Sequence, residues 1–177
     1  MMECRRLKNA EELSASGLWQ LYREAFPREE RRSWHQQCRA MALEESFCCL
    51  EMREADVVVG LIFCWEMGGA VFVEHFAVKA ELRGRGLGRR MLEYLQNCGR
   101  PLVLEAELPL DEVAVRRLRF YQNAGFTILP VEHVQLPFHK DTPAVAMHLL
   151  SWPDPLGYEA LKALELFLRE RVMIYAG

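Results

Sequence analysis

Residues 74–90 constrain the fold of this chain more than any other segment. An apolar stretch typical of a β-strand ends at Val78, and a glycine-rich loop then leads into a segment with helical periodicity. Gly84, Gly86 and Gly88 allow loop conformations that a Cβ would forbid, and they let backbone N–H groups approach an anion closely. Because the first N–H groups of a helix are unpaired and its dipole favours negative charge there, the segment predicts a phosphate or pyrophosphate site.

Positive charge surrounds this loop, on Arg83, Arg85, Arg89 and Arg90. The loop does not fit the dinucleotide-binding pattern G-x-G-x-x-G, because Arg89 occupies the third glycine position counted from Gly84. It does not fit a P-loop either, since no Gly-Lys-Ser/Thr follows. A glycine-rich helix start without any ligand is the structural alternative.

Periodicity and turn residues around the loop predict a mixed α/β fold, with a central sheet flanked by helices. Helices are expected over residues 11–24, 29–43, 87–97, 111–123 and 158–175, and strands over 47–52, 57–66, 71–78, 102–107, 126–129 and 144–150. We expect one domain over residues 1–150, with residues 151–177 as a C-terminal helical extension packed on it. That last helix would either cap the core or make a dimer contact, so both monomer and homodimer stay open.

Composition excludes several other classes of protein. The formal net charge of −3 argues against a strongly basic nucleic-acid surface. The longest apolar run, residues 57–65, is far shorter than the ~20 residues of a membrane-spanning helix. The charged start of the chain is not followed by an apolar signal segment, so we expect a cytoplasmic protein. The cysteines and histidines show no zinc-binding spacing, so no metal is expected.

Two motifs resemble one known family. The pattern Arg83-x-x-Gly86-x-Gly88, after a strand and at the start of a helix, resembles the acetyl-coenzyme A signature of the GCN5-related N-acetyltransferase (GNAT) superfamily. The second motif is Tyr121, shortly before a Gly-Phe pair in the helix that follows the next strand. The resemblance covers roughly residues 45–150, with one departure: Ala114 stands where the family often has an asparagine that contacts pantetheine.

The resemblance implies an acetyl-CoA site between two splayed strands of the sheet. The residues that would bind acetyl-CoA are Phe76, Ala77, Val78, Arg83, Gly84, Arg85, Gly86, Leu87, Gly88 and Arg89. A backbone N–H near Phe76 would polarise the thioester carbonyl. Tyr121 would be the general acid that protonates the departing thiolate, whereas its structural alternative is a core aromatic with a hydrogen-bonded hydroxyl.

The general base is a choice between two neighbours on the strand before the loop. Glu74 is the first candidate, because the family often places an acid there, and His75 is the second, because its chemistry suits proton transfer near neutral pH. As adjacent strand residues they are expected to point to opposite faces of the sheet. A purely structural, hydrogen-bonded role is the alternative for each.

The acceptor is expected to bind between residues 26–34 and residues 130–143, by resemblance to the family. Phe26, Glu30 and Glu105 are the candidate substrate-binding residues, since an acidic and aromatic lining suits a cationic amine. The predicted function is therefore acetyl transfer from acetyl-CoA to a primary amine of a small molecule or peptide. The alternatives are a non-catalytic acyl-CoA-binding or sensing domain, an acetyltransferase for protein N-termini or lysines, and an unrelated phosphate-binding protein.

Overall fold

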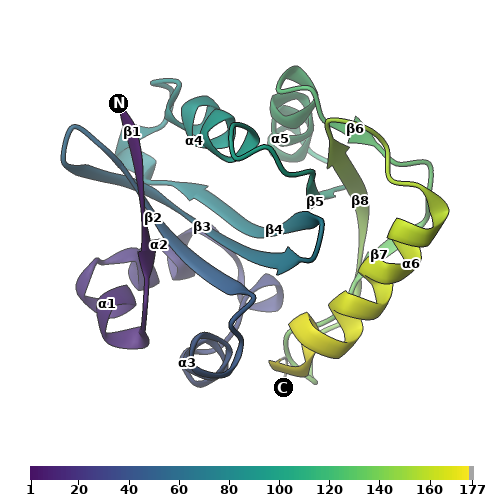
Figure 1. Ribbon diagram of the computed structural model, residues 1–177, viewed down its shortest axis with the longest axis horizontal. Helices are drawn as coiled ribbons and strands as arrows, with labels where there is room; N and C mark the ends of the chain where they lie inside the picture. Colours follow the sequence, from purple (N-terminus) through teal and green to yellow (C-terminus); the bar gives the residue numbers. More distant parts are fainter. Residues whose placement is uncertain (176–177) are drawn as a thin grey trace.

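The computed structural model describes residues 1–175 and contains one mixed sheet flanked by helices (Figure 1). The strands are β1 (Met2–Leu7), β2 (Phe47–Glu54), β3 (Val57–Met67), β4 (Ala70–Val78), β5 (Leu102–Glu107), β6 (Thr127–Ile128), β7 (His133–Gln135) and β8 (Val145–Trp152). The helices are α1 (Ala10–Ala15), α2 (Leu18–Ala25), α3 (Trp34–Leu43), α4 (Leu87–Gln96), α5 (Glu112–Asn123) and α6 (Tyr158–Phe167). Short turns of 3-10 or π-helix are η1 (Arg28–Glu30), η2 (Ala80–Leu82), η3 (Leu168–Val172) and η4 (Met173–Tyr175).

The sheet has the strand order β1-β2-β3-β4-β5-β8-β6, and β7 also pairs with β8. Strands β1 to β4 are antiparallel, β4 and β5 are parallel, and β5 and β8 are antiparallel again. The parallel pair requires a crossover, which α4 provides. The predicted mixed α/β fold is therefore confirmed.

Helices cover both faces of the sheet. Figure 1 shows α4 and α5 on one side and α1, α2 and α3 on the other. Each side has its own apolar core, because alternate strand residues point to opposite faces. The neighbours Cys48 and Cys49 illustrate this alternation, since the first belongs to the core under α4 and the second to the core under α2.

Three local expectations were wrong. Strand β1 was not expected, the helix over 11–24 is divided at Gly17, and the helix over 29–43 begins only after Ser33. Gly17 has a φ of 74°, which interrupts a right-handed helix. Ser33 caps α3 by accepting a hydrogen bond from the N–H of Gln36, whose side chain caps the Ser33 N–H in return.

The C-terminal segment packs into the core on the α2 side of the sheet, where Leu164, Leu168, Val172 and Tyr175 are buried. The Tyr175 hydroxyl donates a 2.8 Å hydrogen bond to Glu44, which follows α3. Residues 176–177 of the expected extension lie outside the described residues. Within residues 1–175, no helix combines the length and apolarity needed to cross a lipid bilayer.

Candidate active site

The site begins where β4 and β5 separate. The two strands pair only from Val71 to Val73 on β4 and from Leu102 to Leu104 on β5. Both continue beyond that point, β4 to Val78 and β5 to Glu107. Their C-terminal halves therefore diverge and leave a gap in the sheet, as the resemblance implied.

A cavity of about 610 Å³, called here the main cavity, passes through this gap. It is lined by residues of α2, η1, β4, the glycine loop, β5 and α5. It brings together every candidate site residue named from the sequence except Arg85: Phe26, Glu30, Glu74, His75, Phe76, Ala77, Val78, Arg83, Gly84, Gly86, Leu87, Gly88, Arg89, Glu105 and Tyr121. A volume of this size lies in the range of about 300–1,000 Å³ that is usual for small-molecule sites.

The glycine loop has the geometry of an anion site at one end of the main cavity. Gly84 and Gly86 have φ values of 75° and 73°, a region that L-residues with side chains rarely adopt. Gly86 is the N-cap of α4 and provides no side-chain cap, so the first N–H groups of the helix remain available to a ligand. A Cβ at Gly88 would lie 3.6 Å from both Val78 and Phe120, an ordinary contact distance, so the packing of α4 does not itself require glycine there.

The arginines around this loop differ in their contacts. Arg89 donates to Glu93 at 2.7 Å and to the Asn123 carbonyl at 2.8 Å, and thus links α4 to α5. Arg83 donates through Nε to the Val78 carbonyl at 3.1 Å, which leaves its two terminal nitrogens for a ligand. Arg116, on α5, also lines the cavity. The donors present, backbone N–H groups and guanidinium groups, suit the phosphates of a coenzyme A molecule.

Tyr121 points into the main cavity from α5 and is only 7% exposed. Its side chain contacts the rings of Phe120 and Phe126, and its hydroxyl makes no hydrogen bond with another residue of the range 1–175. Burial raises the pKa of Tyr121 to about 12, although the charge of Arg117 lowers it in part. The phenol therefore keeps its proton at neutral pH and can donate it.

Glu74 and His75 lie on the same side of the sheet, so the expectation that they point to opposite faces was wrong. The reason is a bulge: His75 pairs with Phe63, whereas the next residue of β3, Cys64, pairs with Val73. The extra residue, Glu74, breaks the alternation of the strand. The Nδ1 atom of His75 consequently lies 3.5 Å from a carboxylate oxygen of Glu74.

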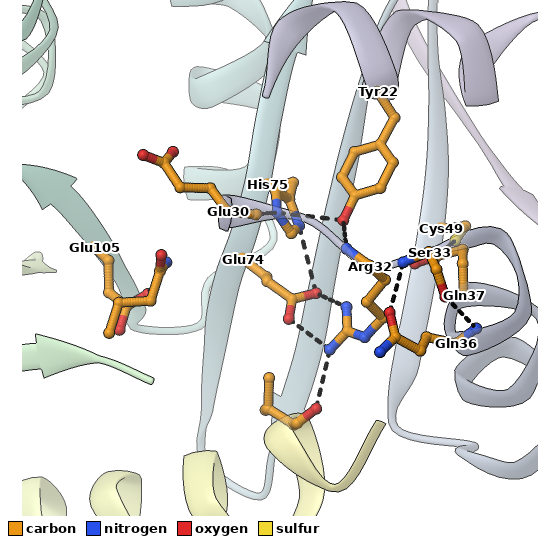
Figure 2. A network of polar contacts seen from close by, with 12 residues as sticks. Tyr22, Glu30, Arg32, Ser33, Gln36, Gln37, Cys49, Glu74, His75 and Glu105 are labelled. Atoms are coloured by element: carbon orange, nitrogen blue, oxygen red, sulfur yellow. Dashed lines mark hydrogen bonds and ion pairs between the residues drawn. The ribbon is translucent and has the colours of Figure 1, made fainter. Parts of the chain in front are cut away.

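The Glu74 carboxylate is bound by Arg32, a residue that the sequence analysis did not single out (Figure 2). The guanidinium makes two hydrogen bonds to it, at 2.6 and 2.7 Å, and donates a third to the Val172 carbonyl at 3.0 Å. The rings of Phe47, Trp65 and Phe138 surround the guanidinium, which is completely buried. Burial alone would raise the pKa of Glu74, but Arg32 and His75 outweigh it and lower that pKa to about 2.

His75 connects this ion pair to the loop that carries Glu30. Its Nε2 atom is 2.8 Å from the Glu30 carbonyl oxygen, to which it donates, while Nδ1 faces Glu74. The hydroxyl of Tyr22 lies 3.4 Å from the same Nε2 and accepts a hydrogen bond from the backbone N–H of Arg32. The network thus fixes the backbone of residues 30–32 against β4.

The Glu30 side chain points away from this network and into the main cavity (Figure 2). Burial raises the pKa of Glu30, and the neighbouring charges of Arg117 and His75 oppose that effect. Among the described residues, no ion pair or hydrogen bond occupies its carboxylate. Glu30 is therefore the carboxylate in the cavity that is free to accept a proton.

The other two carboxylates at this end of the main cavity have partners. Glu105 lies 2.5 Å from Nε2 of His133 and accepts a hydrogen bond from Gln135 at 2.8 Å. Glu107 forms an ion pair with Arg117 of α5. Both line the main cavity, because alternate residues of a strand point to the same face of the sheet.

Comparison with known proteins agrees with this geometry. Residues 44–128 match the family model described as the acetyltransferase (GNAT) domain. A GNAT-family protein from Bacteroides thetaiotaomicron has a solved structure that superposes with a TM-score of 0.86, at 28% identity over 99% of each chain. The structure of YncA from Salmonella typhimurium, solved with acetyl-CoA, superposes with a TM-score of 0.54 at 17% identity, over 89% of this chain and 96% of that one.

A curated relative, the acetyltransferase-family protein YjbC of Bacillus subtilis strain 168, is 38% identical over 64 residues. That alignment covers 34% of this chain and 33% of YjbC, so the chain matches about a third of that relative's length. The fold, the splayed strands and the family match over residues 44–128 place this chain with the GNAT acetyltransferases.

Proposed function

We propose that this protein is an acetyl-CoA-dependent N-acetyltransferase that acetylates a primary amine of a small molecule or peptide. The observation that carries the proposal is the continuity of the main cavity. It extends from the N-terminus of α4, past Tyr121 and through the gap between β4 and β5, to the free carboxylate of Glu30. The acetyl-CoA held by YncA, which shares this fold, supports the choice of coenzyme.

The α4 end of the main cavity would hold the coenzyme. The N–H groups that follow Gly86, together with Arg83 and Arg116, would bind its phosphates. Phe76 and Phe120 supply apolar surface between this loop and the gap, where the pantetheine arm would lie. When bound, acetyl-CoA supplies the acetyl group and a thiolate leaving group.

Two residues of this chain would move the protons. An amine is protonated at neutral pH and must lose a proton before it can attack a thioester. We assign that base role to Glu30 rather than to Glu74 or His75, because Glu74 is held by Arg32 and His75 is held by the Glu30 carbonyl. Tyr121, which keeps its proton, would donate it to the departing thiolate.

Thermal unfolding with saturating acetyl-CoA, coenzyme A or ATP tests the coenzyme site. At about 100 times its dissociation constant a ligand adds roughly 2.7 kcal/mol of stability, or about 5–10 °C for a chain of this size. We expect acetyl-CoA and coenzyme A to stabilise the protein and ATP not to. Release of thiol from acetyl-CoA in the presence of a panel of amines then tests the transfer reaction.

A pair of glycine variants makes the test specific. Gly86→Ala and Gly68→Ala both place a side chain at a positive φ, of 73° and 66°, but Gly68 lies in the β3–β4 turn, outside the main cavity. Both should lose about 1–2 kcal/mol of stability. Only Gly86→Ala should also lose stabilisation by acetyl-CoA. Stabilisation without thiol release for any amine or peptide would instead indicate a binding or sensing domain.

A further inference from the structure

A second cavity, of about 280 Å³, adjoins the main cavity on the acceptor side. We call it the side cavity; its walls are β4, β5, β7, the segment after β7 and the C-terminal segment. Three residues, Glu74, Glu105 and Gln135, line both cavities. The side cavity therefore adjoins the place where the acceptor amine would meet Glu30.

The walls of the side cavity are mostly apolar. They include Phe72, Val134, Leu136, Phe138, Leu168, Val172 and Met173. Val134 and Leu136 are 49% and 40% exposed, so part of their apolar surface is accessible to solvent. The side chain of Phe138, in contrast, is buried against Arg32 and fixes the inner wall.

Both carboxylates inside the side cavity already have hydrogen-bonding partners. Arg32 neutralises Glu74, and His133 and Gln135 bind Glu105. The remaining charged side chains, Glu132, Glu165 and Arg169, are exposed. The interior therefore suits an apolar group better than a second ammonium group.

We propose that the side cavity binds an apolar substituent of the acceptor, so that the preferred acceptor is a primary amine carrying an aromatic or branched aliphatic group. This inference rests on the proposed N-acetyltransferase activity and specifies its substrate class. The amine lies at Glu30 and Glu105, and the apolar group lies against Leu136, Phe138 and Leu168. The volume is below the range of about 300–1,000 Å³ for drug-sized ligands, which fits a single ring or a branched alkyl group.

Two amines that differ only in the apolar group test this proposal. With the wild-type protein and acetyl-CoA, phenethylamine should have a kcat/KM at least roughly tenfold above that of ethylamine, because each buried methylene contributes about tenfold or more. Cadaverine, a diamine, should not exceed phenethylamine. Equal use of phenethylamine and ethylamine, or a clear preference for cadaverine, overturns the proposal.

A matched pair of variants tests whether the preference for phenethylamine arises in the side cavity. Leu136→Asp places a charge in the wall of the side cavity, whereas Val131→Asp places the same charge on a side chain that is similarly exposed but lines neither cavity. Leu136→Asp should lower kcat/KM for phenethylamine much more than for ethylamine, so that most of the preference for phenethylamine is lost; Val131→Asp should keep the preference. An unchanged preference in Leu136→Asp, or an equal loss for both amines, overturns the proposal. Binding of acetyl-CoA without acetylation of any amine would instead refute the proposed function.

Discussion

Replacing Arg32 with methionine removes one half of a completely buried ion pair and keeps an apolar side chain among Phe47, Trp65 and Phe138. Arg32 and His75 together outweigh burial and lower the pKa of Glu74 from its ordinary value of 4.5 to about 2. A difference of that size corresponds to about 3 kcal/mol of stability. Breaking a buried pair by removing one partner costs about 3–5 kcal/mol, so the two magnitudes agree.

We expect the stability of Arg32→Met to change with pH in a direction that identifies Glu74 as the cause. In the wild type the pKa of Glu74 is lower in the folded than in the unfolded protein. Its contribution to the stability of the fold is therefore present above about pH 4.5 and is lost as the pH falls towards 2. In Arg32→Met the burial that raises the pKa of Glu74 is opposed only by His75, so we expect that pKa to rise above its ordinary value. Stability is then lost as the pH rises through that raised pKa.

Urea unfolding at pH 5 and pH 8 measures this effect. We expect Arg32→Met to be less stable than the wild type by about 3 kcal/mol or more at pH 8, and by clearly less at pH 5. The double variant Arg32→Met/Glu74→Gln removes the unpaired charge, and should be more stable at pH 8 than the single variant. A loss below about 1 kcal/mol, or the same loss at both pH values, would refute the assignment of this pair as a buried charge interaction.

Three further predictions concern catalysis. Tyr121→Phe should lower kcat by about 10²–10⁴-fold while stabilisation by acetyl-CoA is kept; a normal kcat would remove the general-acid role. Because burial raises the pKa of Glu30, wild-type activity should fall as the pH drops through that raised value. Glu30→Gln should lose this acidic limb of the pH profile together with most of its rate. The neighbouring Glu29→Gln should keep both the acidic limb and the rate. His75→Phe removes the hydrogen bond that holds the Glu30 carbonyl, so kcat should fall while the KM for acetyl-CoA is unchanged; a change in that KM alone would contradict the assigned role.

The conformation of the glycine loop could be predicted from the sequence because its signal is local. Alternating glycines between a strand and a helix permit backbone conformations with positive φ, and Gly84 and Gly86 indeed have positive φ values. The position of Tyr121 near the cavity followed from the resemblance to the family. The separation of β4 and β5 came from the same source and was confirmed by their pairing.

Strand β1 and the bulge in β4 could not be predicted, because neither has a local signal. Strand β1 is an edge strand in which Leu7 is the buried residue, so it lacks alternating apolar side chains. The bulge depends on how β4 pairs with β3. A single extra residue placed His75 on the same face as Glu74, so that both belong to the network around Arg32.

Arg32 shows why the buried network was missed, and why it matters to both cavities. A run of charged residues, 28–32, ordinarily forms a solvated surface, and nothing in the sequence separates Arg32 from Arg31. In the structure Arg32 joins Glu74, which lines both cavities, to the carbonyl of Val172, which lines the side cavity. Its own backbone N–H contacts Tyr22 beside His75, and His75 holds the loop of Glu30. Because one ion pair fixes both the proposed base and the wall of the side cavity, Arg32→Met should change acceptor selectivity as well as rate, whereas Tyr121→Phe should change the rate alone.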